Sequence, residues 1–479
     1  MWLRSESLSE RSGSMLSLMG FLTIGVILAV LLTNRVAAVV ALAGVPILGG
    51  LIAGFSPAEI GGFVSEGLGG VVGVTTMFVF AIIYFGLMRD AGMFDPIIDR
   101  IVSFAGNAPV TVCVATTLLA CAAHLDGAGA TTFLITIPAM LPLFDRLGMS
   151  RLVLTTCVGL GAGVMNVLPW GGPTARAAAV TDVAVNDLWV PLIPAQVAGV
   201  VAAVAIAWWL GRRERRRLAG ITTEHAQQAQ GVTTVGGSRV ISGASDSVSS
   251  GAGGDGSAGE EGEEAGEDLR RPQLFWFNVA LTIAVIACLV AAVAPPELLF
   301  LVAVLIALLV NYPGLKQQTA RIEAHSKGAM LMATTLLAAG VFLGILEGSG
   351  MIDAMASTAA GLIPDGAAPA LPLIVGVLGV PLSLVFGPDA YYFGVMPVLI
   401  GVGEQFAVSG VAIASASLIG EETVGFPISP LTGSFYLLVG LGGVEIGRHI
   451  RHLIGWAWLV SIVMLLVAIA TGAVPLWVA

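Results

Sequence analysis

The sequence predicts an all-α polytopic membrane protein built from two related halves, and three observations support this fold class. Of the 479 residues, 56% are hydrophobic and only 11% are charged, whereas soluble proteins average about 25% charged residues. Apolar runs that could cross a bilayer recur along the chain, as in LSLMGFLTIGVILAVLL at 16–32 and WAWLVSIVMLLVAIA at 456–470. Segments of the first half return in the second half at nearly constant spacing, which indicates a duplication.

The duplication is visible in three pairs of segments. They are FGLMRDAGMFDPI (85–97) with FLGILEGSGMIDAM (342–355), ITIPAMLPL (135–143) with GVMPVLI (394–400), and NVLPWGGPTAR (166–176) with TVGFPISPLTGS (423–434). The loop at 88–101 contains Arg89 and Arg100, whereas its partner at 347–361 contains no Lys or Arg. Since cationic loops stay in the cytoplasm, we expect matching loops on opposite sides of the membrane and repeats of inverted topology.

A polar segment between the halves divides the chain into three parts. It opens with GRRERRR (211–217) and continues with Gly, Ser, Thr, Ala and acidic residues, which cannot bury enough apolar surface to become ordered. Its arginines place it on the cytoplasmic side. We therefore expect a first transmembrane repeat at 1–210, a disordered cytoplasmic linker at 211–271 and a second, inverted repeat at 272–479.

About ten segments are long enough to cross the membrane, five in each half. They are 15–33, 36–54, 70–88, 152–184 and 190–210, then 274–293, 297–311, 329–346, 411–445 and 453–475. Two further segments, 109–143 and 370–400, have arms of about 15 residues, too short for a full crossing, and are expected to be re-entrant hairpins. Amphipathic helices are expected at 92–104 and 350–362, and an external loop at 55–69.

Four stretches break the pattern of simple spanning helices. Two are hairpin tips, HLDGAG (124–129) and FGPDAYY (386–392), and two interrupt the long segments, NVLPWGGPTAR (166–176) and TVGFPISPLTG (423–433). Their Gly and Pro residues unwind helices and free backbone groups, which in a bilayer must be satisfied by protein, water or a ligand. Interrupted segments at matching positions predict a transporter binding site near the membrane midplane, although kinks that only aid packing are the alternative.

The hairpin tips carry the acidic residues of the predicted site. Gly127 and Gly129 permit the first tip to turn, which holds Asp126 in the cavity, and Asp389 takes a comparable place in the second tip. An ionised carboxylate at membrane depth is costly, so each aspartate is expected to face a polar path. Either could carry a proton or contact the metal of a metal–substrate complex; a helix N-cap is the structural alternative.

Further residues in these four stretches, and two acids just before the last one, complete the site. Arg176 is expected to fix an anionic substrate through its guanidinium fork, unless it forms a buried ion pair with Asp182 or another acid. His124 is a candidate for proton movement or a structural hydrogen-bonding residue. Glu421 and Glu422 form either a proton relay or a solvated turn. The remaining predicted binding residues are Asn166, Gly171, Gly172, Thr174, Tyr391, Ser429 and Thr432.

Several function classes are excluded by missing motifs. The chain has no G-x-x-x-x-G-K-[ST] loop, so nothing in the sequence suggests that ATP drives its work. It has no H-E-x-x-H or G-x-S-x-G arrangement, which argues against an enzyme. The net charge of −10 is not gathered into a nucleic-acid-binding patch. No cofactor is expected.

The segments GLMRDAGMFDPIIDRI, HLDGAGATTFLITIPAMLPLFDRLGM, NVLPWGGPTARAA, FGPDAYYFGVMPVL and VGFPISPLTGSFYLLVGL resemble the citrate–divalent metal–proton symporter family, CitMHS. The resemblance covers nearly the whole chain, although the linker at 212–271 looks longer and more polar than expected. It implies an elevator-type homodimer of the ion-transporter superfamily in the cell membrane. It also implies that citrate enters as a complex with a divalent cation such as Mg²⁺ or Ca²⁺, driven by protons. A sodium-coupled dicarboxylate symporter and a cation/proton antiporter of the same superfamily are the alternatives.

Overall fold

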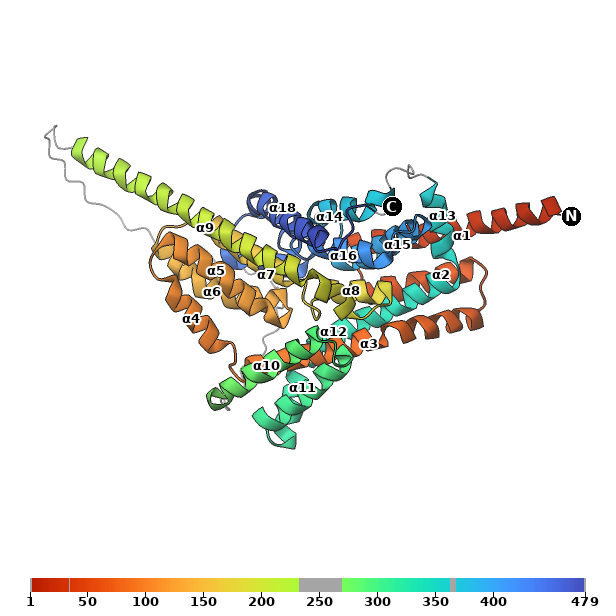
Figure 1. The fold of residues 1–479 in the computed structure, drawn as a ribbon, viewed down its shortest axis with the longest axis horizontal. Coiled ribbons are helices and arrows are strands. Elements are labelled where there is room, and N and C mark those ends of the chain that lie inside the picture. Colours follow the sequence, from red (N-terminus) through yellow and green to blue (C-terminus); the bar gives the residue numbers. More distant parts are fainter. Residues whose placement is uncertain (1, 34, 232–268, 362–367, 478–479) are drawn as a thin grey trace, which may run out of the picture.

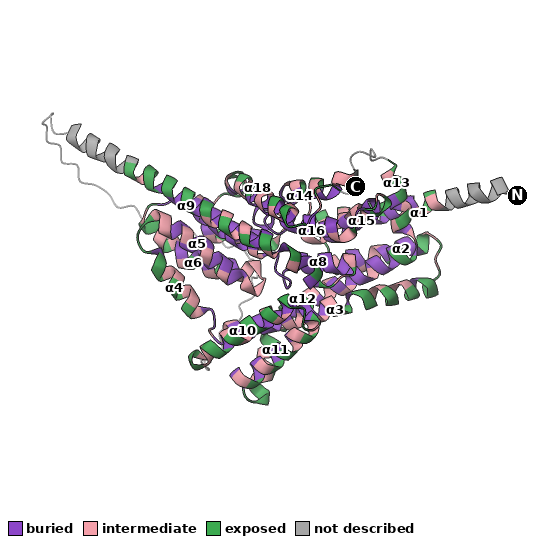
Figure 2. Cartoon of the chain, viewed as in Figure 1, coloured by how far each residue is buried: buried purple, intermediate pink, exposed green. Residues whose placement is uncertain are grey.

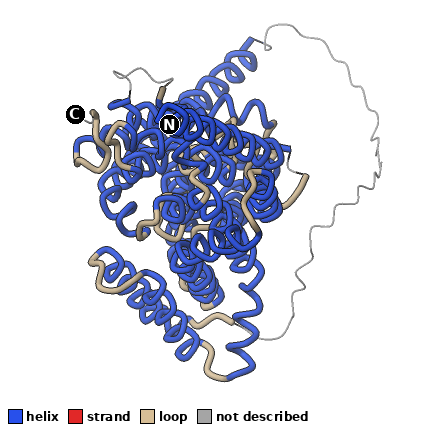
Figure 3. The backbone as a smooth tube through the Cα atoms, turned by 90° about the vertical axis from the view of Figure 1, so that its right-hand side faces the viewer, coloured by secondary structure: helices blue, strands red, loops and turns tan. Residues whose placement is uncertain are grey.

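The structure, a computed structural model, describes residues 2–33, 35–231, 269–361 and 368–477 (Figure 1). Within these ranges every regular element is a helix, and Figure 3 shows helices joined by loops, without strands. Seven of the described helices are long and apolar enough to cross a membrane. The chain is therefore a multi-pass membrane protein, as predicted.

The first half contains eleven helical elements in the described residues. They are α1 (Trp2–Thr33), η1 (Val40–Gly44), α2 (Val45–Ile52), α3 (Pro57–Asp90), α4 (Asp95–Ala105), α5 (Pro109–Ala123), η2 (His124–Asp126), α6 (Gly129–Arg146), α7 (Arg151–Met165), α8 (Gly172–Thr181) and α9 (Val185–Gly231). The predicted breaks in this half lie where α5 gives way to α6 and where α7 gives way to α8. The amphipathic segment at 92–104 is α4.

The second half follows the same order of long helices, hairpin arms and broken helices. Its elements are η4 (Pro272–Leu274), α10 (Phe275–Val290), α11 (Pro296–Asn311), α12 (Leu315–Gly348), α13 (Met351–Ala360), η5 (Ala368–Ala370), α14 (Leu371–Leu382), η6 (Ala390–Val395), α15 (Met396–Gln405), α16 (Gly410–Gly420), η7 (Phe426–Ile428), α17 (Gly433–Gly442) and α18 (Ile446–Ala470). The helices α3 and α12 each have 34 residues, and α8 and α17 each have 10.

Two sequence expectations about helix bounds are wrong. The expected external loop at 55–69 is mostly helix, because α3 begins at Pro57 behind a capping box in which Ser56 and Glu59 bond to each other's backbone N–H. The expected disorder does not begin at residue 211, because α9 continues to Gly231. The part of the expected linker at 232–268 lies outside the described residues.

The helices pack in two groups. The long-helix group, defined as α1–α3 and α10–α12, contains the closely packed pair α3 and α12, with α10 and α11 at the lower side of Figure 1. A Cβ atom on Gly67 would overlap the Gly340 carbonyl oxygen, so small residues are what let α3 and α12 approach. The hairpin group, defined as α5–α9 and α14–α18 with their short helices, is joined by contacts of α9 with α18 and of α6 with α17.

The outer faces of the bundle are apolar. Figure 2 shows exposed residues along α10 and α11, and among them Ile283 and Leu309 are 61% and 66% exposed. Large exposed apolar side chains over a whole helix face are typical of a surface in contact with lipid. The polar residues of the four broken stretches instead lie in the interior, where the two groups of helices meet.

Candidate functional site

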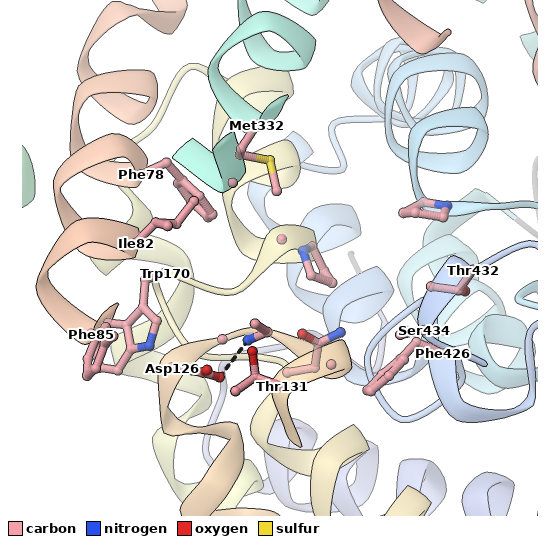
Figure 4. Close-up of a pocket in the computed structure, with 18 of the residues that line it drawn as sticks. Phe78, Ile82, Phe85, Asp126, Thr131, Trp170, Met332, Phe426, Thr432 and Ser434 are labelled. Carbon is pink, nitrogen blue, oxygen red and sulfur yellow. Dashed lines mark hydrogen bonds between the residues drawn. The ribbon is translucent and has the colours of Figure 1, made fainter. Parts of the chain in front are cut away.

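A cavity of about 430 Å³ lies between the long-helix group and the hairpin group (Figure 4). One wall is formed by α3 and α12, and the opposite side by the first hairpin tip, both broken stretches and the start of α17. Eight of the predicted site residues line it: Asp126, Gly127, Gly129, Asn166, Gly172, Arg176, Glu422 and Thr432. Three of the four broken stretches thus supply most of this side of the cavity, and the fourth contributes Pro388.

The first hairpin tip is a tight turn that places Asp126 on the cavity. Gly127 has a left-handed backbone conformation (φ 73°), and a Cβ atom there would lie 2.9 Å from the carbonyl oxygen of Trp170. Asp126 Oδ1 accepts a hydrogen bond from the Ala128 N–H at 2.9 Å. Trp170 also stabilises the tip, since its indole N–H donates a hydrogen bond to the Leu125 carbonyl oxygen at 2.7 Å.

Arg89 is a site residue that the sequence did not single out for binding. It stands in the last turn of α3, and its guanidinium donates to Thr131 Oγ1 at 3.1 Å. The same nitrogen lies 3.6 Å from Asp126 Oδ2, and the Arg89 side chain is 39% exposed. Arg89 therefore links the long-helix group to the tip of the first hairpin through a loose ion pair.

Arg176 forms a tighter ion pair with the second hairpin tip. Its Nε donates to Asp389 Oδ1 at 2.7 Å, and the two side chains are 11% and 24% exposed. Of the two interpretations of Arg176, the structure therefore shows the ion pair with an acid. The acid is Asp389 and not Asp182. Asp389 itself does not line the main cavity but a neighbouring one, whereas Arg176 lines the main cavity.

His124 lies behind the cavity wall and holds three elements together. It is fully buried, with Nδ1 2.7 Å from Thr132 Oγ1 and Nε2 3.2 Å from Asn166 Oδ1. Because the Asn166 amide nitrogen donates to the Glu422 carbonyl oxygen at 2.7 Å, its Oδ1 faces the ring as an acceptor. The ring then donates to Asn166 from Nε2, and the Thr132 hydroxyl, which lies 2.7 Å from Nδ1, also lies 2.9 Å from the Ala128 carbonyl oxygen to which it can donate its single proton. This chain of hydrogen bonds joins the first hairpin to both broken stretches and supports the structural interpretation of His124.

Two adjacent acids are buried just before the second broken stretch. Glu421 and Glu422 are 0% and 1% exposed, so the alternative of a solvated turn is wrong. Glu422 lines the cavity, accepts from the Thr432 hydroxyl at 3.0 Å through Oε2, and leaves Oε1 without a partner in the described residues. Its backbone is left-handed (φ 50°), a strained state for a residue with a side chain. Glu421 instead points to the second hairpin, where it accepts from Ser383 at 3.2 Å.

Five other predicted site residues lie off the cavity. The Thr174 hydroxyl donates to the Val167 carbonyl oxygen at 3.0 Å, which closes the first break. Tyr391 is fully buried and pairs with Ser417 at 2.8 Å. Ser429 is fully buried in the second break. A Cβ atom on Gly171 would lie 2.5 Å from the Asn166 carbonyl oxygen, so close packing explains this glycine. Asp389 is the fifth.

Three helix N-termini face the cavity. The first residues of α6, α8 and α17 line it, through Gly129, Gly172 and the pair Thr432 and Ser434. Unpaired backbone N–H groups and the helix dipole make such ends attractive to anions. With the two guanidinium groups, which come from opposite walls, they bring positive charge to the cavity, while Asp126 and Glu422 supply two carboxylates that can hold a cation. No group of three or more His, Cys, Asp or Glu in the described residues is arranged to bind a bare metal ion.

The sequence profile of a family described as citrate transporter matches residues 12–420. This chain belongs to the citrate transporter family. In Bacillus subtilis (strain 168), a protein named citrate transporter is 40% identical over 96% of this chain and 100% of its own length. A second, named Mg(2+)/citrate complex secondary transporter, is 38% identical over 96% of this chain and 100% of its own length.

The fold is also that of a solved transporter. The crystal structure of the YdaH transporter of Alcanivorax borkumensis matches with a TM-score of 0.54 at 14% identity, covering 85% of this chain and 87% of that one. Membership of the citrate transporter family confirms the resemblance seen in the sequence motifs. It also confirms that the chain is a transporter and not an enzyme, because its relatives are transporters.

In this member of the citrate transporter family, sequence reasoning missed most of the cavity wall formed by the long helices. Phe78, Ile82 and Phe85 come from α3, and Met332 from α12 (Figure 4). Nothing in an apolar helix distinguishes a residue that faces a cavity from one that faces lipid, so these positions carried no signal. Trp170 and Phe426 do lie inside the broken stretches. Aromatic rings in such Gly- and Pro-rich segments could have been predicted to line the site.

Proposed function

We propose that this protein is a secondary active transporter that imports citrate, or a similar carboxylate, as a complex with a divalent metal cation by proton symport. The observation that carries the proposal is the joint presence of two guanidinium groups, three helix N-termini and two carboxylates around one cavity. A site for a simple anion needs only the positive groups, and a site for a simple cation needs only the acids. Both kinds together suit a complex in which an anion and a cation travel as one cargo.

The anion is expected to lie against Arg176 and the helix N-termini. Citrate has three carboxylates, and a guanidinium binds a carboxylate through parallel hydrogen bonds. The N-termini of α6, α8 and α17 add backbone donors on the same side of the cavity. Arg89, whose contact with Asp126 is loose, is free to reorient toward a second carboxylate.

The cation is expected to lie against Asp126 and Glu422. Carboxylate oxygens are the ligands that Mg²⁺ and Ca²⁺ prefer, and Glu422 Oε1 is buried without a partner in the described residues. Neither acid alone would hold a bare divalent ion, so the citrate oxygens must supply the remaining ligands. This supports a metal that enters only as part of the complex, as Mg²⁺ does in the relative named for an Mg(2+)/citrate complex.

The arrangement of the two halves supports an elevator mechanism. The hairpin group carries most of the binding residues, and the long-helix group provides one wall of the cavity. We infer that the halves are repeats of inverted topology, that the hairpins are re-entrant, and that the hairpin group moves against the long-helix group. We further infer a homodimer in the cell membrane with the linker in the cytoplasm.

Uptake of radiolabelled citrate into vesicles that contain the purified protein tests the proposal. We expect uptake with Mg²⁺ or Ca²⁺ and an inward proton gradient, and little uptake when a chelator removes the metal. A sodium gradient that drives uptake as well as protons do would favour the sodium-coupled alternative instead. Absence of citrate uptake with every divalent metal and either gradient would overturn the proposed function.

A further inference from the structure

The Arg176–Asp389 ion pair separates two cavities. Arg176 lines the main cavity, and Asp389 lines a second cavity of about 370 Å³ on the other side of the second hairpin tip. Pro388 lines both. Apart from Asp389, the described residues around the second cavity are uncharged, among them Leu31, Leu431 and Tyr436. Asp389 therefore has Arg176 as its nearest positive charge in the described residues.

The Arg176–Asp389 pair joins a positive and a negative group, as the proposed complex of a cation with citrate does. A substrate carboxylate that binds the Arg176 guanidinium must take the place of Asp389 Oδ1, which now lies 2.7 Å from Nε. That exchange would leave the Asp389 carboxylate, whose side chain is 24% exposed, without a counter-charge beside a cavity whose other described lining residues are uncharged. Removing one partner from a buried ion pair strongly destabilises the other, whereas giving both members new partners does not.

From this geometry we propose that cargo binds by exchange of ion pairs. The citrate carboxylate replaces Asp389 at Arg176, and Asp389, released from Arg176, turns to the cation that accompanies citrate beside Asp126 and Glu422. A free anion satisfies only Arg176, and a free cation satisfies only Asp389. Asp389 is therefore a specificity-determining residue, which makes the site accept the complex and reject metal-free citrate. This inference rests on the proposed function and adds the reason for its requirement of two ions.

The position of Glu422 supports the exchange. Glu422 lines the main cavity together with Arg176, and its Oε1, which has no hydrogen-bond partner in the described residues, offers a transient acceptor within the site. Gly172 supports it as well, because Arg176 Nη1 lies 2.8 Å from the place that a Cβ atom on Gly172 would take. A glycine at this position lets the guanidinium remain at the surface of the cavity, where a substrate can reach it.

Binding measurements by titration calorimetry on the purified full-length protein test the exchange. The ligands are citrate with a chelator, Mg²⁺ alone, and citrate with saturating Mg²⁺. For the natural chain we expect the complex to bind on the order of 10- to 100-fold more tightly than metal-free citrate. In Asp389→Asn we expect metal-free citrate to bind about tenfold or more tightly than in the natural chain, so that the preference for the complex largely disappears.

Two variants separate this effect from a folding defect or a general change of charge. Asp389→Glu keeps the carboxylate and is expected to keep the preference for the complex, even if its affinity falls. Asp145→Asn removes one acid from the exposed Arg151–Asp145 pair, whose side chains are each 45% exposed, and should leave both affinities unchanged. Its effect on net charge equals that of Asp389→Asn.

The outcomes distinguish this inference from the proposed function. If the natural chain prefers the complex and Asp389→Asn keeps that preference in full, the ion pair is structural and the exchange is wrong. The same conclusion follows if Asp389→Glu and Asp389→Asn lose the preference equally. If the natural chain binds no citrate with any divalent metal, the proposed function fails, and the exchange fails with it.

Discussion

The two hairpin tips each place an aspartate beside an arginine, but the two ion pairs are built differently. At the first tip, Asp126 and Arg89 are 3.6 Å apart and the arginine is 39% exposed. At the second tip, Asp389 and Arg176 are 2.7 Å apart and the arginine is 11% exposed. The first pair joins the hairpin to α3 of the long-helix group, whereas the second lies within the hairpin group. Separating Arg89 from Asp126 should cost little free energy, whereas separating Arg176 from Asp389 without new partners should cost more.

Both arginines belong to the first half of the chain. Since α3 begins at Pro57 and α12 at Leu315, the position in α12 that matches Arg89 is Glu347. In the paired segments NVLPWGGPTAR (166–176) and TVGFPISPLTGS (423–434), the position that matches Arg176 is Ser434. The two halves therefore repeat the helices and the hairpins, but only the first supplies cationic groups at these positions. A site whose two arginines both come from one half suits an asymmetric cargo better than two equal half-sites would.

The largest effect is expected for Arg176→Gln, which removes the tighter arginine. The change deprives the substrate of its main cation and leaves Asp389 unpaired, and loss of one partner of a desolvated charge pair costs about 2–5 kcal/mol. We expect kcat/KM for citrate uptake to fall on the order of 100-fold or more. Uptake into vesicles with matched amounts of inserted protein measures it. An unchanged apparent KM would relegate Arg176 to a structural role.

A smaller but still large effect is expected for Asp126→Asn at the first tip. The amide oxygen can still accept from the Ala128 N–H, so the turn is kept, but the negative charge that would face the cation is lost. We expect transport to fall about tenfold or more, or to lose its dependence on the proton gradient. Citrate uptake with and without an imposed gradient distinguishes these results. Wild-type uptake and coupling would refute the assignment of Asp126.

A modest effect is expected for Arg89→Gln, which breaks the looser pair. Exposed ion pairs contribute about 0–1 kcal/mol, and the Arg89 side chain is 39% exposed. We expect the apparent KM for citrate to rise about two- to fivefold, with a smaller effect at high salt because screening already weakens this contact. A loss as large as that of Arg176→Gln would remove the contrast between the two tips.

Sequence reasoning located the tips and breaks because they violate a simple physical rule. Gly and Pro inside apolar segments free backbone groups that lipid cannot satisfy, so such stretches mark the interior, and three of the four meet at the cavity. The pairing of Arg176 with Asp389 was not predicted, because 213 residues separate them and only the packing of α8 on the second hairpin brings them together. The start of α3 could have been read from the Ser56–Glu59 capping box, which the expectation of a loop at 55–69 overlooked.

The smallest effect on citrate uptake is expected for Gly127→Ala and Gly387→Ala. These two substitutions also compare the two hairpin tips directly. Gly127 is left-handed (φ 73°), and a Cβ atom there would lie 2.9 Å from the Trp170 carbonyl oxygen. Gly387 has no positive φ, and its Cβ would meet the Leu431 Cβ at an ordinary 3.4 Å. A non-glycine residue in the left-handed region costs about 1–2 kcal/mol.

We therefore expect Gly127→Ala to lower the apparent melting temperature by roughly 1–3 °C, with a lower rate of citrate uptake, since the distorted tip misplaces Asp126. Gly387→Ala should leave both quantities near those of the natural chain, because its backbone already suits an alanine. Thermal unfolding and citrate uptake, measured on both variants under the same conditions, test whether only Gly127 requires glycine. Equal effects at both glycines would mean that the two tips turn in the same way, contrary to the backbone angles on which the comparison rests.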